Sequence, residues 1–452
     1  MFPFVGAPDR PALVLGPGES LTYRDLSAAL EPVRELFGSG RKVLVAIFGD
    51  RDLATVIGYL AALAGGHACA LYRPTLPGPA QQSVIDAYQP DFVVNGTVDL
   101  PGYRPTRIDH IRRRATRPDG EISESTALVL STSGSTGTPR AVRLSYRNLT
   151  SNATAIATAL AVTAADRAIT ALPLHYCYGL SVLNSHLAVG ASVSLTGDGP
   201  SSRNFWRRAA TDRCTNLAGV PTTYELLRRS RIDLDAFPSL RLLTQAGGRL
   251  AQPTVDHFAD LMDRRGGELV VMYGQTEATA RMSCLPHEHR VAGRGSVGRA
   301  VPGGHLSVEA GEVVYEGPNV MLGYATGRAD LALGDVTGGR LRTGDLGYLK
   351  DGWLYLTGRA ARFAKIQGQR INLDDVERAA TEVGPSAVVS APDEHLVIFV
   401  EGDADRFAPL RSRLASQLAI PVRAIQIRAL ERVPTGESGK TDHATLRRMA
   451  NP

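Results

Sequence analysis

Short apolar runs rich in valine, isoleucine and leucine alternate with helical patterns through much of the chain. Residues 42–48 (KVLVAIF), 67–72 (HACALY) and 91–96 (DFVVNG) are predicted to be strands, and a helix is predicted over residues 53–64. Strands that alternate with helices in this way are typical of parallel sheets covered by helices. The pattern therefore predicts a large α/β body.

The pattern changes twice in the last third of the chain. From about Gly295 onward, residues 305–318 and 346–358 are predicted to form hairpins with glycine-containing turns. After Thr357, a charged junction leads into a predicted helix from Leu373, two strands, a second helix and a last strand. This order predicts an N-terminal body over residues 1–358 and a small mobile α+β domain over residues 359–452.

The composition is that of a globular protein, and it excludes several classes. The chain has 452 residues, of which 43% are hydrophobic and 21% charged, so it can bury a large core. The most apolar window, residues 53–72, is interrupted by two glycines and a histidine, and residues 1–10 lack a secretory pattern. We therefore expect a soluble enzyme with no membrane partner.

The cysteines and the charge narrow the expectation further. Cysteines stand alone at four widely spaced positions: Cys69, Cys177, Cys214 and Cys284. This spacing gives no disulfide framework or zinc site and suits the reducing cytoplasm. The net charge is +5, and the arginines at 112–114 and 117 have no interleaved aromatic residues. We expect a solvated loop there and no nucleic-acid partner.

Three familiar motifs are present only in part. Residues 293–298 match G-x-G-x-x-G but lack a strand before them and a helix after them, so we expect a loop. The Gly439-Lys440-Thr441 segment lacks the first glycine of a P-loop, because position 434 is proline. His287 and His289 lack the spacing of a helical zinc motif and are expected to be surface histidines.

A run of hydroxyl groups and glycines between two apolar strands is the most informative segment. It contains the candidate phosphate-binding residues Thr132, Ser133, Gly134, Ser135, Thr136 and Gly137. Their backbone N–H groups and hydroxyls suit an anion, and Arg140 adds a fixed positive charge. From these residues alone, a flexible Ser/Gly hairpin loop remains an alternative.

Five segments, in this order, resemble the motifs of the acyl-adenylate-forming ligases, a family that includes acyl-CoA synthetases, luciferases and nonribosomal peptide synthetase adenylation domains. They are STSGSTGTPRAV (131–142), VMYGQTEA (271–278), RTGDLGYL (342–349), GRAARFAKIQGQRI (358–371) and PTGESGK (434–440). The resemblance covers nearly the whole chain. It implies the adenylate-forming enzyme fold, with helix-flanked sheets, a small β-barrel-like subdomain and the mobile C-terminal domain.

The resemblance also implies a nucleotide site. Tyr273 offers a ring for adenine, and Gly247, Gly248 and Gly274 allow close approach of the backbone. Thr276 is expected to bind the α-phosphate and Glu277 to hold Mg²⁺. The ribose hydroxyls are assigned to Asp345, with Arg359 nearby.

The implied chemistry is attack of a carboxylate on the α-phosphorus of ATP. Lys440 is expected to bridge the two anions, while Arg140 and Mg²⁺ neutralise pyrophosphate. The C-terminal domain then rotates, and the segment near Gly368 guides the thiol of coenzyme A or of a carrier-protein phosphopantetheine. Arg140 replaces the usual lysine and Ala141 the usual glycine, whereas Ala361 replaces the usual hinge Asp or Lys, which leaves thiolation open.

The acyl pocket is expected in segments 172–187, 219–224 and 244–247. Its candidate residues are His175, Tyr176, Cys177, Gly219, Thr222 and Ala246. Cys177 stands where amino-acid-activating relatives carry aspartate, and no acidic residue lies between Leu172 and Val189. We therefore expect a small acid without an α-amine. A stand-alone amino-acid adenylation enzyme and a non-catalytic nucleotide-binding relative are the alternatives, and aryl, short aliphatic and fatty acids all remain open.

Overall fold

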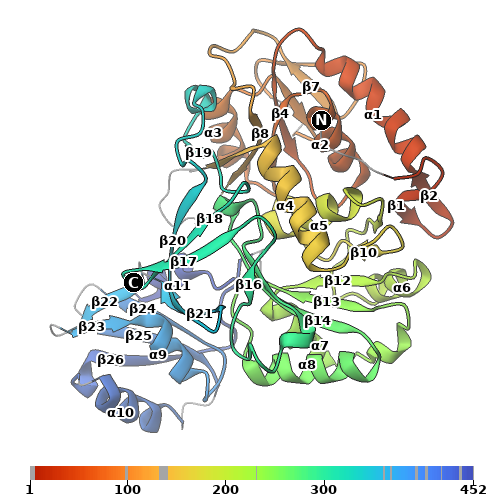
Figure 1. Cartoon of the computed structure of the whole chain (residues 1–452). Coiled ribbons are helices and arrows are strands. Elements are labelled where there is room, and N and C mark those ends of the chain that lie inside the picture. Colours follow the sequence, from red (N-terminus) through yellow and green to blue (C-terminus); the bar gives the residue numbers. More distant parts are fainter. Residues whose placement is uncertain are drawn as a thin grey trace. The chain divides into compact units, whose positions relative to one another are not determined.

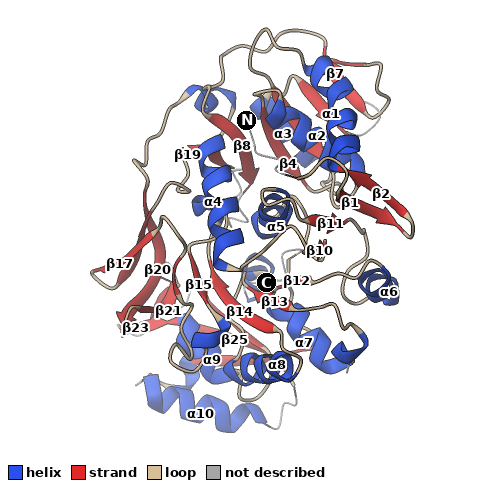
Figure 2. Ribbon diagram, turned by 45° about the vertical axis from the view of Figure 1, so that its right-hand side comes forward, coloured by secondary structure: helices blue, strands red, loops and turns tan. Residues whose placement is uncertain are grey.

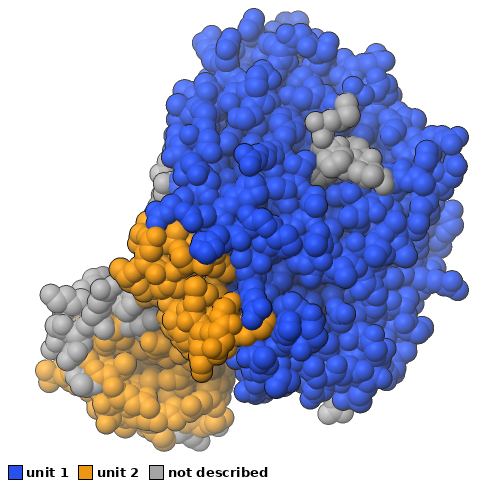
Figure 3. All heavy atoms as spheres, viewed as in Figure 1, with its two compact units in different colours: residues 1–305, 315–341 blue, residues 306–314, 342–452 orange. Residues whose placement is uncertain are grey.

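A computed structural model of the chain describes residues 6–96, 100–131, 141–230, 232–359, 362–366, 369–391, 395–402, 406–418, 420–436 and 440–450. Contacts divide it into two compact units, residues 1–305 with 315–341 and residues 306–314 with 342–452 (Figure 3). The second unit takes in more than the predicted C-terminal domain because residues 306–314 and 342–358 share one small sheet. The domain boundary at residue 358 and the mobility of residues 359–452 stay predictions.

The first sheet of unit 1 has eight strands and carries the predicted parallel core (Figure 1). In spatial order its strands are β19 (Gly323–Ala325), β9 (Ala141–Ser145), β8 (Thr126–Ser131), β4 (Ala68–Tyr72), β3 (Leu44–Phe48), β5 (Phe92–Val94), β7 (Ile111–Arg114) and β6 (Tyr103–Pro105). Its helices are α1 (Tyr23–Phe37), α2 (Leu53–Ala64) and α3 (Gly78–Tyr88). Strands β5, β3, β4 and β8 are parallel neighbours, which confirms the alternation predicted from the sequence.

The second sheet of unit 1 has nine strands. In spatial order they are β16 (Arg299–Ala300), β15 (Ser283–Leu285), β14 (Glu268–Tyr273), β13 (Leu242–Gln245), β12 (Asn216–Gly219), β10 (Arg167–Ile169), β11 (Ser192–Ser194), β1 (Pro11–Gly16) and β2 (Glu19–Thr22). The helices around it are α4 (Tyr146–Ala159), α5 (Cys177–Leu187), α6 (Arg203–Thr211), α7 (Pro221–Ser230) and α8 (Gln252–Arg264).

Helices cover both faces of this sheet. Neighbouring residues of a strand point to opposite faces, so they enter different cores. Ala218 and Leu242 enter the core under α4 and α5, whereas Leu217 and Leu243 enter the core under α6, α7 and α8. Helices α4 and α5 lie side by side in both ribbon views (Figures 1 and 2). Because β12, β13 and β14 pair in parallel, their carboxyl ends lie at the same edge of the sheet.

Unit 2 contains the small β subdomain and the C-terminal α+β structure. Its four-stranded sheet has the order β17 (His305–Glu309), β18 (Glu312–Glu316), β20 (Arg340–Lys350) and β21 (Trp353–Arg359). A ribbon of β22 (Phe363–Ile366) and β23 (Gln369–Asn372) precedes a sheet of β24 (Ser386–Ala391), β25 (His395–Glu401) and β26 (Ile425–Leu430). The helices are α9 (Leu373–Ala380), α10 (Phe407–Leu418) and α11 (His443–Ala450). The predicted hairpins, the predicted C-terminal order and the α/β fold class are confirmed.

Two local expectations are wrong. Residues 112–114 do not form a loop: they lie in the antiparallel strand β7, where the Arg114 guanidinium carbon is 5.6 Å from the centroid of the Tyr103 ring. His287 is buried, and its Nε2 lies 2.7 Å from Oδ1 of Asp263. The helices in the described ranges include none that is long and apolar enough to cross a membrane.

Candidate functional site

Part of the predicted site lies outside the described residues. This part comprises the phosphate-loop residues Thr132, Ser133, Gly134, Ser135, Thr136, Gly137 and Arg140, together with Gly368 and the hinge position Ala361. The roles given to these residues stay predictions. The remaining candidates divide between the two units.

The turn after β14 carries four of the candidates in unit 1. Tyr273 ends the strand and is 9% exposed, and its carbonyl accepts a hydrogen bond of 2.9 Å from the N–H of Met282. At Gly274 a Cβ atom would lie 1.7 Å from the carbonyl oxygen of Ala280, so the turn admits only glycine there. Thr276 begins the 3₁₀ turn Thr276–Ala278, which comes next along the chain.

Glu277 is held in that turn by two hydrogen bonds. Its Oε1 accepts a bond of 3.0 Å from the hydroxyl of Tyr324, and its carbonyl accepts one of 2.9 Å from the N–H of Met321. No cluster of three or more metal-ligating side chains occurs among the described residues. A single positioned carboxylate fits Mg²⁺, which usually takes one or two carboxylates together with phosphate oxygens and water.

The turn at Thr276 meets the predicted acyl segment directly. Oγ1 of Thr276 donates a hydrogen bond of 3.5 Å to Sγ of Cys177, the first residue of α5. Beside it, the hydroxyl of Tyr176 occupies the space around Gly247, where a Cβ atom would lie only 2.5 Å from the phenolic oxygen. Gly247 also has φ = +82°, so both the local backbone and packing against Tyr176 require glycine.

The ends of β12 and β13 complete this edge of the sheet. The N–H of Ala246 donates a hydrogen bond of 3.2 Å to the carbonyl of Gly219. Thr222 is half-buried in the first turn of α7, and Gly248 is exposed. His175 is half-buried just before α5. The six predicted pocket residues thus lie on adjoining segments of unit 1.

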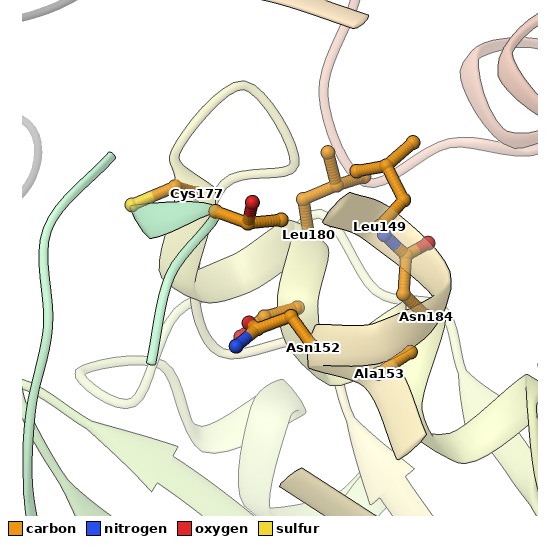
Figure 4. A pocket seen from close by; sticks show the side chains of 8 residues that line it. Leu149, Asn152, Ala153, Cys177, Leu180 and Asn184 are labelled. Atoms are coloured by element: carbon orange, nitrogen blue, oxygen red, sulfur yellow. The ribbon is translucent and has the colours of Figure 1, made fainter. Parts of the chain in front are cut away.

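A small cavity lies between α4 and α5, beside Cys177 (Figure 4). It has a volume of about 10 Å³ and is lined by Leu149, Asn152, Ala153, Cys177, Leu180, Ser181, Asn184 and Thr279. A space of this size holds about one water molecule. Cys177 therefore borders both this cavity and the turn that carries Thr276.

Two residues of this region were not predicted from the sequence. Tyr324 reaches Glu277 from β19, far away in the sequence, so its role has no local signal. Arg281 is 2% exposed, and its guanidinium carbon lies 4.5 Å from the centroid of the Tyr178 ring. The sequence did contain a signal for Arg281, because this residue is the one charged position in the otherwise uncharged segment 278–286.

The remaining candidates belong to unit 2. Asp345 is 5% exposed and faces Arg359 across β20 and β21, with 2.9 Å between its Oδ1 and the arginine Nε. Lys440 is exposed. Its carbonyl accepts a hydrogen bond of 2.8 Å from the N–H of Gly436, and Thr435 pairs with Thr441. The backbone at Lys440 is therefore held by the pairing of residues 435–436 with residues 440–441.

Comparison with known proteins adds the family context. The family model described as "AMP-binding enzyme" matches residues 5–325. The chain is 30% identical to a sulfoacetate–CoA ligase of Cupriavidus necator over 72% of this chain and 67% of that protein. It is 32% identical to an oxalate–CoA ligase of Arabidopsis thaliana over 59% of this chain and 55% of that protein.

A solved structure shares the fold. The o-succinylbenzoate CoA synthetase of Bacillus subtilis, in complex with its acyl-adenylate intermediate, superposes with a TM-score of 0.79 at 22% identity and covers 99% of this chain and 96% of that one. The chain spans between about half and two thirds of the length of the two curated relatives named above.

Proposed function

Because the chain belongs to the AMP-binding enzyme family, we propose that it uses ATP to activate a small carboxylic acid as an acyl-adenylate and then forms a thioester. In the first step a carboxylate oxygen bonds to the α-phosphorus, and the bond from that phosphorus to the bridging oxygen of pyrophosphate breaks. In the second step a thiolate sulfur bonds to the acyl carbon, and AMP leaves.

The contact between Thr276 and Cys177 is the observation that carries this proposal. It joins the turn assigned to the α-phosphate to the helix assigned to the acyl group, with 3.5 Å between Oγ1 and Sγ. Adenylation requires these two groups to meet, because the carboxylate must approach phosphorus in line with the leaving oxygen. The closeness of the turn and the helix at one sheet edge therefore supports the proposal.

The reaction brings two anions together, so positive charge and fixed geometry supply the catalysis. We assign Lys440 to the substrate carboxylate and the α-phosphate, Arg140 to the departing pyrophosphate and Thr276 to an α-phosphate oxygen. Glu277 is the residue that would hold Mg²⁺, supported by the hydroxyl of Tyr324. When bound, the ion neutralises phosphate charge.

The base and the ribose of the nucleotide are assigned to different residues. Tyr273, Gly247, Gly248 and Gly274 are proposed to lie against adenine. Asp345 is proposed to accept hydrogen bonds from the ribose hydroxyls, because it is a buried carboxylate whose position is fixed by the ion pair with Arg359.

The acid is proposed to lack an α-amine, since no acidic residue between Leu172 and Val189 could pair with an ammonium group. The relatives are named for sulfoacetate and oxalate, which both carry two acidic groups, and this supports testing such acids first. Their names also favour coenzyme A as the acceptor, with a carrier-protein phosphopantetheine as the second choice. We assign the reaction to the cytoplasm, which suits four buried cysteines that form no disulfide.

ATP–pyrophosphate exchange tests the first step. Purified protein with ATP and Mg²⁺ is assayed against pools of aryl acids, aliphatic monoacids, diacids and amino acids, without coenzyme A. Exchange confined to one pool supports adenylation and identifies the acid class. Exchange with amino acids alone would replace the proposal with amino-acid adenylation. Silence in every pool, with ATP binding shown by calorimetry, would favour a non-catalytic nucleotide-binding protein.

The second step is tested with the acid that gives exchange. The reaction is repeated with coenzyme A and, separately, with a phosphopantetheinylated carrier protein, and thioester formation is followed by mass spectrometry. A thioester with either thiol supports the full proposal. Accumulation of acyl-AMP with both thiols would limit the function to adenylation. The alanine at the hinge position 361 would then explain why no thioester forms.

A further inference from the structure

The described residues include three arginines whose side chains are almost wholly buried: Arg143 at 0% exposure, Arg281 at 2% and Arg328 at 4%. A guanidinium group is charged at every physiological pH, and burying it is costly unless anions or carbonyl groups surround it. The partners of these three arginines therefore show what each one does.

Arg143 and Arg328 have such partners. The Nε of Arg143 donates a hydrogen bond of 3.2 Å to the carbonyl of Tyr324, and Nη2 donates one of 3.3 Å to that of Leu322. Arg328 forms an ion pair with Asp91, with 3.2 Å between Nη2 and Oδ2. Both arginines stabilise the structure by ordinary hydrogen bonds and charge pairing.

Arg281 differs from both. Its side chain forms neither a hydrogen bond nor an ion pair within the described part of the chain, and its Nε, like that of Arg328, is buried without a partner. Its guanidinium carbon lies 4.5 Å from the centroid of the Tyr178 ring, a cation–π contact that offsets only part of the desolvation cost. The backbone is fixed, because the carbonyl accepts bonds of 2.8 Å from Asn152 and 3.0 Å from Asn319.

The position of this cation connects it to the acyl segment. The ring of Tyr178 contacts the guanidinium group of Arg281. Tyr178 comes directly after Cys177, which in turn contacts Thr276. The hydroxyl of Tyr178 is held by Thr244 of β13, 2.8 Å from its Oγ1, so the ring cannot turn away.

The electrostatics agree with this placement. Burial raises the pKa of Tyr178 to about 12, and the positive charge of Arg281 opposes that rise. The same charge opposes the increase that burial causes in the pKa of Tyr176. The field of Arg281 therefore acts on both tyrosines of the acyl segment.

We infer that Arg281 binds a second acidic group of the substrate, so that the enzyme selects acids with two anionic groups, such as dicarboxylic or sulfocarboxylic acids. This inference rests on the proposed function. One carboxylate reacts at the phosphorus. The other anionic group stays unreacted and supplies the negative charge that pairs with the guanidinium group of Arg281. Carboxylate and sulfonate both accept two parallel hydrogen bonds from a guanidinium group.

The test compares acids that differ only in the second charge. Pyrophosphate exchange is measured with succinate against butanoate, malonate against propanoate, and sulfoacetate against acetate. The proteins are the wild type, Arg281→Met, Arg281→Lys and Arg265→Met. Arg265 is a matched control, because it follows the last residue of α8 and its Nη2 donates a hydrogen bond of 2.7 Å to the carbonyl of Phe237, which packs against the core on the opposite face of the sheet.

For at least one pair, the wild type is expected to use the diacid at least about 30-fold better in kcat/KM, the size of a charge-assisted contact. Arg281→Met is expected to lose that preference without a loss of monoacid exchange, and Arg281→Lys to retain part of it. Arg265→Met should keep the wild-type preference. An equal loss for diacid and monoacid in Arg281→Met, or a wild type that prefers monoacids, would overturn the inference and leave the proposed adenylation intact.

Thermal melting gives a second readout that needs no turnover. Without ligand, Arg281→Met is expected to melt at or above the wild-type temperature, since methionine fills similar space without an unpaired charge. Succinate, malonate or sulfoacetate should raise the melting temperature of the wild type and not that of the variant. A clearly lower melting temperature for the ligand-free variant, or equal effects of these acids on both proteins, would show that Arg281 is structural. Because this readout is independent of exchange, it decides the inference even if exchange is silent with every acid.

Discussion

Oγ1 of Thr276 donates a hydrogen bond to Sγ of Cys177 over 3.5 Å, which ties the turn after β14 to the first residue of α5. The two residues are 99 positions apart in the sequence. Their contact follows from the parallel order of β10, β12, β13 and β14, because α5 comes after β10 and the turn comes after β14, at the same edge of the sheet. Chemistry that needs a phosphate subsite beside an acyl subsite is supported at this edge.

Lys440→Ala is expected to lower the rate of acyl-AMP formation by about 10²–10³-fold, the usual cost of losing one preorganised charge at a transition state. Nucleotide binding, measured by calorimetry, should change little because the side chain is exposed. Lys350→Ala, another exposed lysine of unit 2, is the control and should keep wild-type exchange. Near-normal exchange in Lys440→Ala would remove the role assigned to that residue.

Arg140→Ala is expected to raise the KM for ATP, whereas Arg140→Lys should retain much of the wild-type activity. The reason is that either cation can neutralise the departing pyrophosphate, although only arginine binds two oxygens at once. Steady-state exchange at varied ATP concentration measures both variants. Equal losses would mean that bidentate geometry, and not charge, is what the site requires.

Tyr324→Phe is expected to raise the Mg²⁺ concentration for half-maximal exchange by several-fold. The change removes the bond of 3.0 Å to Oε1 of Glu277, which is worth about 1 kcal/mol when the acceptor keeps access to water. Tyr348→Phe, at an exposed position of β20, is the matched control. An unchanged Mg²⁺ dependence in Tyr324→Phe would show that Glu277 does not depend on this support, or does not hold the ion.

The stability of unit 1 is expected to fall as the pH drops from about 6.5 to about 4. Burial lowers the pKa of His186 to about 4, while the unfolded chain takes up its proton near the ordinary value of 6.5. Between these values the unfolded state binds more protons, so the free energy of unfolding decreases by about 3 kcal/mol as the pH falls. This contribution is complete above pH 6.5, and denaturant unfolding at a series of pH values measures it.

His186→Gln should flatten that pH dependence. The neutral ring donates from Nδ1 to the carbonyl of Val182 over 2.8 Å and accepts at Nε2 from Asn216 over 2.9 Å, which protonation would disrupt. Some slope should remain, because burial also lowers the pKa of His67, which belongs to unit 1. His257→Gln, at an exposed position of α8, is the control. An unaltered slope in His186→Gln would contradict the assignment.

Much of the fold can be predicted from local patterns. The helix over residues 53–64 matches α2 at both ends, because Asp52 caps its first turn and Gly65 comes after its last residue. The glycine-containing turns likewise placed the hairpins of unit 2. The loop predicted at residues 112–114 is wrong, since the pairing of that segment with β5 and β6 depends on strands that only the sheet brings together.

The candidate residues of the motifs could also be named from the sequence, because five segments resemble the motifs of one family in the same order. The residues that support them could not. Tyr324 reaches Glu277 across 47 positions, and whether a buried arginine has a partner depends on every element packed around it. The sequence by itself determined most of the elements, the motifs and the kind of reaction that we propose. The tertiary structure alone decided that Arg281 is buried over Tyr178 without a counter-charge among the described residues, since burial and pairing are properties of the packed chain and not of any segment.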